Sequence, residues 1–304
     1  MIVVFGSLNV DLIFAMRTLP TPGQTLLAES LRIEPGGKGA NQALAAARDG
    51  ADVAMVGAVG TDHLSGIVLA NLVEAGADVS RVSRVEASTG CAGILTDVAG
   101  ANMIAVASGA NRAARAAQAE DALLARQPTV LVQLEGQPEE AEAFIERAAD
   151  HGCRVILNLA PARRIDEKTL RRCSLLVVNE SEAAEVASWV GAAATAAGLR
   201  RALGMDVLRT RGAAGSEASS RLEGEIATPA PAIRAVETAG AGDTFIGVLG
   251  SALDKGATLA AAMARAAEAA ALACSRPGTQ SSIPWRRQTD AAVLERELRR
   301  KPKA

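Results

Sequence analysis

Short apolar runs alternate along this chain with longer, alanine-rich stretches of helical spacing, and no other feature limits the possible folds as much. A strand buried on both faces reads as a continuous apolar run, and the helices that connect parallel strands cover those faces. The sequence therefore predicts an α/β fold with a parallel-rich central sheet and helices on both faces. We expect strands over residues 2–5, 53–56, 130–134, 155–159, 175–178 and 207–210, and helices over 41–49, 64–75, 139–150, 181–190 and 246–252.

Two stretches depart from this alternation. Residues 11–33 are rich in Pro, Gly and Thr, and residues 88–107 alternate like a β-hairpin that turns at 97–102. We expect both to leave the main sheet and to form a small β-sheet lid, over roughly residues 7–34 and 88–108. No repeat or low-complexity linker divides the chain, so residues 1–304 are predicted to form a single domain that carries this lid.

The charge balance and the cysteines argue against several classes of protein. The 32 Lys and Arg against 34 Asp and Glu leave a formal net charge of −2, so no basic field indicates a nucleic-acid partner. No apolar run approaches the length of a membrane span, and the apolar N-terminus lacks the basic residues of a signal peptide. The four scattered cysteines and two histidines show no zinc-ligand spacing, which indicates free thiols in a reducing cytoplasm, where we expect the protein.

A glycine-rich turn at residues 237–245 is the most informative segment, because it opens a helical run. Backbone N–H groups that converge at a helix N-terminus favour phosphate oxygens. A carboxylate repels phosphate, so Asp243 is an unexpected residue in a simple anion site. Its presence is explained if Asp243 takes a proton from a hydroxyl that attacks the phosphate. The alternative is that Asp243 only caps the helix.

A second glycine cluster, residues 35–42, also opens a helix but lacks the spacing of a Walker loop. Its glycines let a ligand approach the backbone, while Lys38 and Asn41 offer hydrogen-bond donors suited to sugar hydroxyls. Taken alone, this cluster is equally compatible with a structural turn.

The two clusters occur within an ordered series of short segments that resembles the ribokinase (pfkB) carbohydrate kinase family. The resemblance covers nearly the whole chain, and the ordered set is far more specific than any one segment. It includes residues 6–11, 20–23, 36–42, 88–90, 109–111, 133–135, 158–163, 179–182, 210–212, 240–245 and 278–285.

The resemblance implies a fold and an activity. The fold is ribokinase-like, with the β lid often used to form a homodimer, and the activity is transfer of the γ-phosphate of ATP to the primary hydroxyl of a sugar. Asp243 would be the base, with Gly240, Ala241 and Gly242 in the anion-binding turn. The residues implied to bind the sugar are Asn9, Asp11, Gly37, Lys38, Asn41, Glu135 and Asp243.

The resemblance also implies cofactor sites for ATP, Mg²⁺ and K⁺. Glu182 would act on Mg²⁺ through water, and the alternative is that Asn179 and Glu182 merely start a helix. The nucleotide would contact Asn179, Thr210, Gly212, Gly215 and Gly242. A potassium loop would comprise Glu237, Ala239, Ala273, Arg276, Gly278 and Ser282.

Four departures from the family pattern accompany these expectations. Glu237 stands where Asp is usual, which puts the position or strength of the K⁺ site in question. The other three are Leu159 in place of Pro, Ile246 in place of Asn, and Ala267 in place of a polar residue near the adenine.

Three functions remain open at this stage. D-ribose is the first candidate acceptor, and deoxyribose, a ketose or a nucleoside is the alternative within the same chemistry. The third is a catalytically silent sugar-binding regulator, which the presence of Asp243 and its glycines disfavours. The expected lid contacts Ala92, Ile94, Ala105 and Ala107 are small and not aromatic, which favours a bare sugar over a nucleoside.

Overall fold

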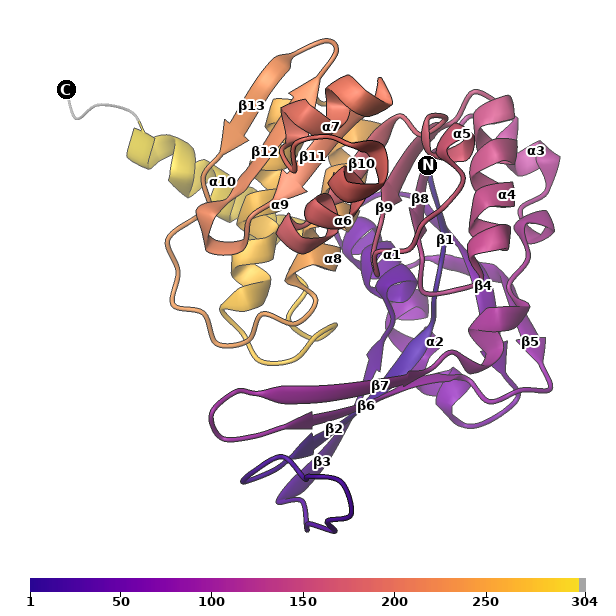
Figure 1. The fold of residues 1–304 in the computed structure, drawn as a ribbon, viewed down its shortest axis with the longest axis vertical. Coiled ribbons are helices and arrows are strands. Elements are labelled where there is room, and N and C mark those ends of the chain that lie inside the picture. The colour runs from indigo at the N-terminus through magenta and orange to yellow at the C-terminus, as the bar shows by residue number, and fades with distance from the viewer. Residues whose placement is uncertain (301–304) are drawn as a thin grey trace.

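The computed structural model describes residues 1–300, apart from the side chain of Arg300, and the last four residues of the predicted domain lie outside the described part. A nine-stranded, mostly parallel sheet runs through the middle of the molecule (Figure 1). Strand β1 (Ile2–Phe5) lies in the interior of this sheet, is buried along its whole length and pairs in parallel with β4 (Val53–Gly60) and β8 (Thr129–Gln133). The other strands are β5 (Asp78–Val85), β9 (Arg154–Asn158), β10 (Leu175–Val178), β11 (Asp206–Thr210), β12 (Ser216–Ser220) and β13 (Gly224–Thr228), in the spatial order β13-β12-β11-β10-β9-β8-β1-β4-β5.

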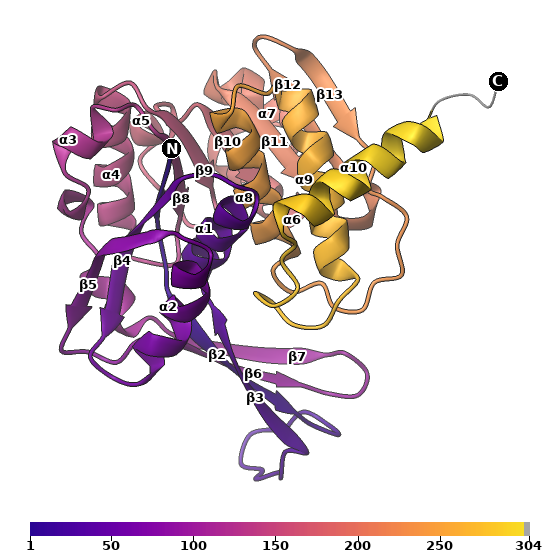
Figure 2. The same ribbon diagram turned by 180° about the vertical axis from the view of Figure 1, so that it is seen from behind.

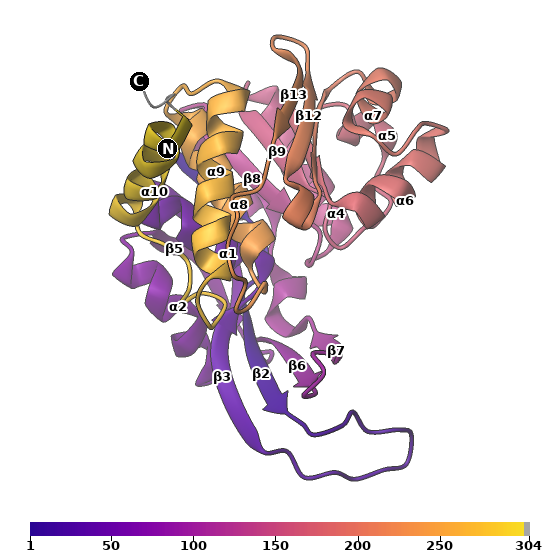
Figure 3. The same ribbon diagram turned by 90° about the vertical axis from the view of Figure 1, so that its left-hand side faces the viewer.

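Helices cover both faces of this sheet, as the sequence predicts (Figure 3). One face carries the helices seen in front in Figure 2, and the other carries the remaining ones. The helices of the first face are α1 (Lys38–Arg48), α2 (Leu64–Glu74), α8 (Ala241–Asp254), α9 (Leu259–Cys274) and α10 (Arg286–Arg300), and those of the second are α3 (Asp121–Leu124), α4 (Pro138–Asp150), α5 (Glu167–Leu170), α6 (Glu180–Val190) and α7 (Ala196–Leu203). In residues 1–300 no helix combines the length and the apolar character that a membrane crossing requires.

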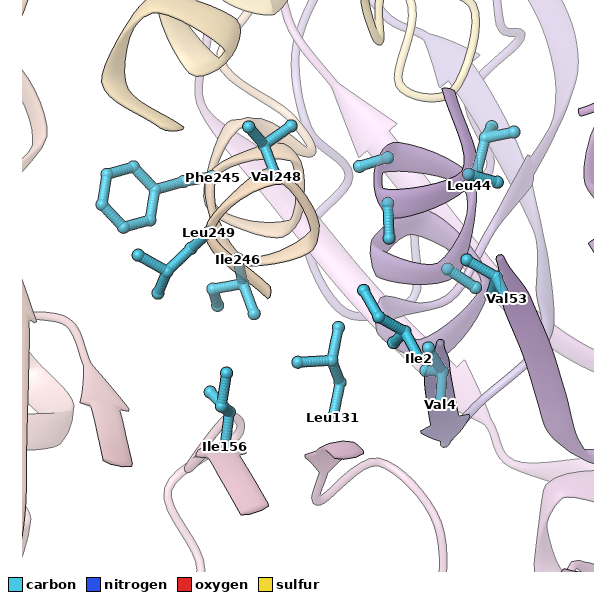
Figure 4. Packing of buried hydrophobic residues seen from close by; sticks show 14 of the residues in the cluster. Ile2, Val4, Leu44, Val53, Leu131, Ile156, Phe245, Ile246, Val248 and Leu249 are labelled. Atoms are coloured by element: carbon cyan, nitrogen blue, oxygen red, sulfur yellow. The ribbon is translucent and has the colours of Figure 1, made fainter. Parts of the chain in front are cut away.

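Two hydrophobic cores follow from the alternation of side chains along each strand. Ile2 and Val4 of β1 join the core beneath α1 and α8, which Figure 4 shows from close by. Phe5 points to the opposite face, where its ring stacks on that of Phe144 from α4 with centroids 4.8 Å apart. Each central strand therefore contributes to both cores, which explains why its sequence is apolar throughout.

All six predicted strands and all five predicted helices are present, with ends that differ by a few residues. The elements that were not predicted from the sequence include β5, β12 and β13. Strand β5 reads DVSRVSRV and lies at one edge of the sheet, while β12 reads SEASS and β13 lies at the other edge. Strands at and near an edge keep polar side chains, so a search for continuous apolar runs does not find them.

A separate four-stranded sheet projects below the carboxyl ends of the central strands (Figure 1). This small sheet confirms that the two irregular stretches leave the main sheet. Strand β2 pairs in parallel with β6 and antiparallel with β3, and β7 forms the predicted hairpin with β6. The strands are β2 (Asn9–Ala15), β3 (Ser30–Gly36), β6 (Gly90–Thr96) and β7 (Asn102–Ala107).

Candidate active site

Polar side chains gather where the parallel strands end. Gln133 is the last residue of β8, Asn158 ends β9, and Asn179 follows β10. Because the carboxyl ends of parallel strands meet at one edge of the sheet, side chains far apart in the sequence converge there. Helices α1 and α8 begin at this same edge and direct their N-termini toward it (Figure 1).

Three adjoining cavities occupy this edge. A polar cavity of about 980 Å³ lies between the small sheet and the main body of the molecule. A small cavity of about 140 Å³ adjoins it, and an apolar cavity of about 590 Å³ adjoins the small one. Asp243 and Lys38 line both the polar and the small cavity, while Thr210 and Gly242 line both the small and the apolar cavity. The three cavities therefore form one path, and Asp243 stands at its first junction.

Asp243 lies in the first turn of α8, with 8% of its surface exposed. The N-cap of α8 is Gly240, at φ 72°, so the alternative that Asp243 merely caps the helix is wrong. A Cβ added at Gly240 would lie 2.8 Å from Cγ2 of Thr279, and both constraints require glycine at this position. The positive end of the α8 dipole therefore faces the path, and within residues 1–300 no side chain caps it.

Two side-chain amides hold the Asp243 carboxylate. Asn41 Nδ2 donates to Oδ2 and Gln42 Nε2 donates to Oδ1, each at 3.0 Å. The Asn41 amide, predicted to serve a sugar, is therefore largely engaged with Asp243, although Asn41 also lines the polar cavity. A carboxylate held at both oxygens has a fixed orientation, which a base needs if it is to meet an incoming hydroxyl.

The polar cavity brings together every residue that the sequence reading assigned to sugar binding, and all of them line it. Glu135 is fixed by the Ser7 hydroxyl at 2.5 Å and by the Lys38 backbone N–H at 3.0 Å. Gly37, at φ 89°, turns the chain into α1 so closely that an added Cβ would lie 2.7 Å from the backbone nitrogen of Asn9. The set is Asn9, Asp11, Gly37, Lys38, Asn41, Glu135 and Asp243.

Burial and neighbouring charges shift the pKa values of two side chains in this cavity. Burial raises the pKa of Asp11 to about 7, and the neighbouring carboxylates Glu135, Glu34 and Asp243 add to the effect. Asp243 raises the pKa of Lys38 above its usual value, against the opposing effect of burial. Lys38 therefore stays positively charged at the junction of two cavities, where a phosphate would need it.

The structure corrects the predicted lid contacts in the lining of the polar cavity. Ala92 and Ile94 line it as expected, but Ala105 and Ala107 do not, because side chains alternate along β7. Ile104 and Val106 occupy the inward positions instead. Among the described residues that line this cavity none is aromatic, as expected.

Asn179 and Glu182 line the small cavity together with Asp243. Asn179 Oδ1 accepts the Glu182 backbone N–H, and Glu182 Oε2 accepts the Asn179 backbone N–H, each at 2.8 Å. This reciprocal capping box starts α6, so the structural role that was the alternative is present. Burial raises the pKa of Glu182, and the lining position leaves a cation-binding role open as well.

The apolar cavity is lined by the remaining residues predicted for the nucleotide. Thr210, Gly212, Gly215 and Gly242 all border it, and Ala241 of the anion-binding turn joins them. A Cβ added at Gly242 would meet nothing within 4 Å, so this residue keeps the approach to the α8 N-terminus open. Ala267, one of the departures from the family pattern, also lines this cavity.

The predicted potassium residues lie on two adjacent segments, one before α8 and one that runs from the last turn of α9 into the loop after it. Glu237 N–H donates to the carbonyl of Cys274, and Gly278 N–H donates to Glu237 Oε2 at 2.9 Å. Carbonyl, hydroxyl and carboxylate oxygens are suitable donors for a hard cation. The Glu237 carboxylate, however, also faces the guanidinium of Arg32 at 3.7 Å, so part of its charge is already compensated. The six residues are Glu237, Ala239, Ala273, Arg276, Gly278 and Ser282, of which Glu237 and Ala239 also line the polar cavity.

Several polar residues of this region were not singled out from the sequence. Gln42 donates a hydrogen bond to Asp243, Gln133 donates one to Gln42, and Gln280 donates one to Asn41. Gln42 follows Asn41 inside the glycine cluster, and Gln133 ends an otherwise apolar strand. A polar residue at the carboxyl end of a buried strand was the available signal.

Comparison with known proteins agrees with this geometry. The family model described as pfkB family carbohydrate kinase matches residues 1–286. Among curated proteins, the chain is 33% identical over 312 residues to the ribokinase of Schizosaccharomyces pombe, covering 96% of this chain and 97% of that protein. It is 35% identical over 292 residues to the deoxyribokinase of Salmonella typhi, covering 93% and 95%.

Solved structures lead to the same family. The ribokinase of Thermotoga maritima superposes with a TM-score of 0.89 at 30% identity, over 96% of this chain and 99% of that one. The ribokinase of Arabidopsis thaliana, solved with ribose and ATP, has a TM-score of 0.86 at 27% identity, over 96% and 98%. This chain belongs to the pfkB family and is a carbohydrate kinase of the ATP-dependent, ribokinase-like kind.

Proposed function

We propose that this chain transfers the γ-phosphate of ATP to the 5-hydroxyl of D-ribose, giving ribose 5-phosphate and ADP, with Asp243 as the general base. One observation carries the proposal: the Asp243 carboxylate lines both the polar cavity and the small cavity beside it. A sugar hydroxyl in the first and a phosphate in the second would meet at the same proton acceptor. Phosphoryl transfer needs this juxtaposition more than any covalent help from the protein.

The phosphate end of the reaction is supported by backbone and side-chain charge. The N-terminus of α8 presents the backbone N–H groups of a first helical turn next to Asp243. The Lys38 ammonium lines the same cavity and would stabilise charge that develops on the transferred group. Phosphate repulsion by Asp243 is thereby offset.

The sugar end is supported by a dense set of acceptors. Asp11 and Glu135 border one cavity with the amide of Asn9, and carboxylates accept hydrogen bonds from neighbouring hydroxyls. Asn111 Nδ2 donates to Asn9 Oδ1 at 2.7 Å, so the Asn9 amide group faces the cavity as a donor. Donors and acceptors together match a polyhydroxylated ligand better than an apolar one.

ATP would extend from the small cavity into the apolar one. Thr210, Gly212 and Gly215 would lie against the nucleoside, and Asn179 and Glu182 would serve the phosphates. In residues 1–300 no group of three or more acidic, His or Cys side chains is arranged to hold a metal ion. Mg²⁺ would therefore bind chiefly to the nucleotide phosphates, with Glu182 acting through water.

Three further features belong to the proposal. K⁺ would bind carbonyl oxygens of the Glu237 loop and activate the enzyme weakly, because Arg32 already compensates the carboxylate. The outer face of the small sheet exposes about half of Leu31, Ile33 and Met103, which suits a lid that pairs with a second copy of the chain. All four cysteines are unpaired, as suits the reducing cytoplasm, where we expect the enzyme to act.

A nucleoside is the second candidate acceptor. The polar cavity, at about 980 Å³, has far more room than a pentose fills. Against this, the described lining holds no aromatic side chain on which a base could stack. We therefore rank a free pentose first.

The test is a comparison of ADP release with ribose, deoxyribose, fructose and inosine as acceptors. We expect ribose to have the highest kcat/KM, with deoxyribose lower because it lacks one hydroxyl for the carboxylates. A strong preference for inosine would refute the ribose assignment and retain the base. Absence of turnover with every acceptor would refute the proposed activity.

A further inference from the structure

Two chains of side-chain amides converge on Asp243, one on each carboxylate oxygen. In the first, Asn71 Nδ2 donates to Gln280 Oε1, Gln280 Nε2 donates to Asn41 Oδ1, and Asn41 Nδ2 donates to Asp243 Oδ2. Each of these three bonds is 3.0 Å long. The chain runs from a half-buried residue on α2 to the centre of the site.

The second chain is shorter and enters from the sheet. Gln133 Nε2 donates to Gln42 Oε1 at 2.5 Å, and Gln42 Nε2 donates to Asp243 Oδ1 at 3.0 Å. The same Gln42 nitrogen donates its second hydrogen to Asn158 Oδ1, also at 3.0 Å. Gln42 therefore uses both hydrogens and its oxygen within the site.

The charge on Asp243 sets the orientation of every amide in both chains. An ionised carboxylate only accepts hydrogen bonds, so Asn41 and Gln42 must turn their NH₂ groups toward it. Their oxygens then face away and must accept, which requires Gln280 and Gln133 to present NH₂ groups in turn. The amide dipoles consequently align head to tail, and aligned hydrogen bonds polarise and strengthen one another.

Gln280, the middle member of the first chain, lies on a loop that is itself held in place. The guanidinium of Arg48 donates to the carbonyls of Gln280 and Ile283 at 2.7 and 2.8 Å, and lies 5.1 Å from the ring centroid of Trp285. These contacts fix the loop that carries Gln280 against the end of α1. From this loop the fully buried Gln280 side chain bonds to Asn71 on one side and to Asn41 on the other.

The second chain includes a cost. Gln133 is 2% exposed, and within residues 1–300 its Oε1 has no hydrogen-bond partner. A buried polar atom without a partner destabilises the folded state, and an apolar side chain of the same shape would avoid this penalty but would also remove the donor to Gln42 Oε1. Packing alone gives no reason for this glutamine, whereas orientation of Gln42 does.

We propose that Gln42, Gln133, Gln280 and Asn71 are positioning residues that hold both oxygens of Asp243 in one orientation. The carboxylate keeps two acceptor sites free of the amides, and one of them receives the proton of the attacking hydroxyl. This inference rests on the proposed role of Asp243 as the base. It assigns the four amides to the transition state and not to the binding of sugar or ATP.

The experiment compares kcat, both KM values and thermal stability in single variants. Gln133→Met and Gln280→Met should each lower kcat about tenfold while both KM values stay within about twofold. Asn71→Ala, at the half-buried end of the first chain, should lower kcat about threefold and fold normally. Gln133→Met removes an unpartnered buried oxygen but also removes the donor to Gln42 Oε1, so the thermal midpoint should change little while kcat falls.

The matched control is Gln118→Met. Gln118 Nε2 donates to the carbonyls of Gly57 and Arg81, away from the three cavities, so this variant should lose stability and keep its kcat. Unchanged kcat in Gln133→Met, Gln280→Met and Asn71→Ala, beside an inactive Asp243→Asn, would overturn this inference alone. Full activity in Asp243→Asn would overturn the base assignment and the inference with it.

Discussion

Ribose should bind this chain more tightly as the pH rises from about 6 to about 8, because an ionised Asp11 offers both carboxylate oxygens as acceptors to the sugar hydroxyls, whereas the protonated carboxyl offers fewer. Burial, with the neighbouring carboxylates, raises the pKa of Asp11 to about 7 in the empty site. A group with that pKa is about one-tenth ionised at pH 6 and about nine-tenths ionised at pH 8. If only the ionised form binds ribose, the dissociation constant falls about tenfold over this range.

The same carboxyl makes the stability of the protein depend on pH. Its pKa lies at about 7 in the folded chain against a usual value of 3.8, so the folded state binds the proton more tightly. This contribution to stability is complete below the usual value and is lost as the pH rises through about 7. Asp11→Asn should therefore be more stable than the parent at pH 8, by up to about 4 kcal/mol, with the difference vanishing near pH 4.

Calorimetric titration of ribose without ATP measures the binding directly, because the phosphates of ATP also titrate near neutral pH. Thermal unfolding of the parent and of Asp11→Asn follows the stability. In the variant, ribose should bind weakly and with no pH dependence between about pH 6 and about pH 8. A parent whose affinity is flat over that range, or a variant that keeps the tenfold dependence, would refute this reasoning.

Three further predictions follow from single contacts. Phe144→Ala should cost about 3–5 kcal/mol of unfolding free energy, since Phe144 is fully buried against Phe5 and lines none of the three cavities, and chemical denaturation should show this loss with kcat unchanged. Gly240→Ala should lower kcat and destabilise the protein by about 1–3 kcal/mol, because alanine would strain the φ of 72° and contact Thr279; a variant with parental kcat and stability would contradict that geometry. Glu237→Gln should reduce activation by K⁺ and leave the K⁺-free rate near that of the parent, and an equal response to K⁺ in both proteins would exclude Glu237 from the cation site.

The sequence predicts the framework of this fold well, for a physical reason. Strands such as β1 and β10 are buried on both faces, so their whole sequence is apolar and easily found. Strands β12 and β13 escaped because they lie at and beside the sheet edge and carry polar residues. Alternation in residues 88–107 predicted the hairpin of the small sheet, but not which of its side chains face the cavity. Ala105 was predicted to line the cavity, and Ile104 lines it instead.

The candidate site was predictable where a motif concentrates it. Asp243 and Lys38 follow from glycine clusters that open helices, and both line the junction of the cavities. Gln280 was not predictable, because a single glutamine in a loop carries no local pattern. The strand end marks Gln133 as a polar residue, but its contact with Gln42 was not predictable, because both glutamines bond to residues more than ninety positions away. Their importance appears only when the fold brings separate strands and loops to one carboxylate.

The measurement that tests the central claim most directly is the identification of the product by ³¹P NMR after incubation with ribose, ATP and Mg²⁺. The parent protein should place phosphate on the 5-hydroxyl of ribose, and Asp243→Asn should form this product about 10²–10⁴-fold more slowly while still binding ribose. Ribose 5-phosphate formed at the parental rate by Asp243→Asn would contradict the role of Asp243. No phosphorylated ribose from the parent would contradict the proposed function itself.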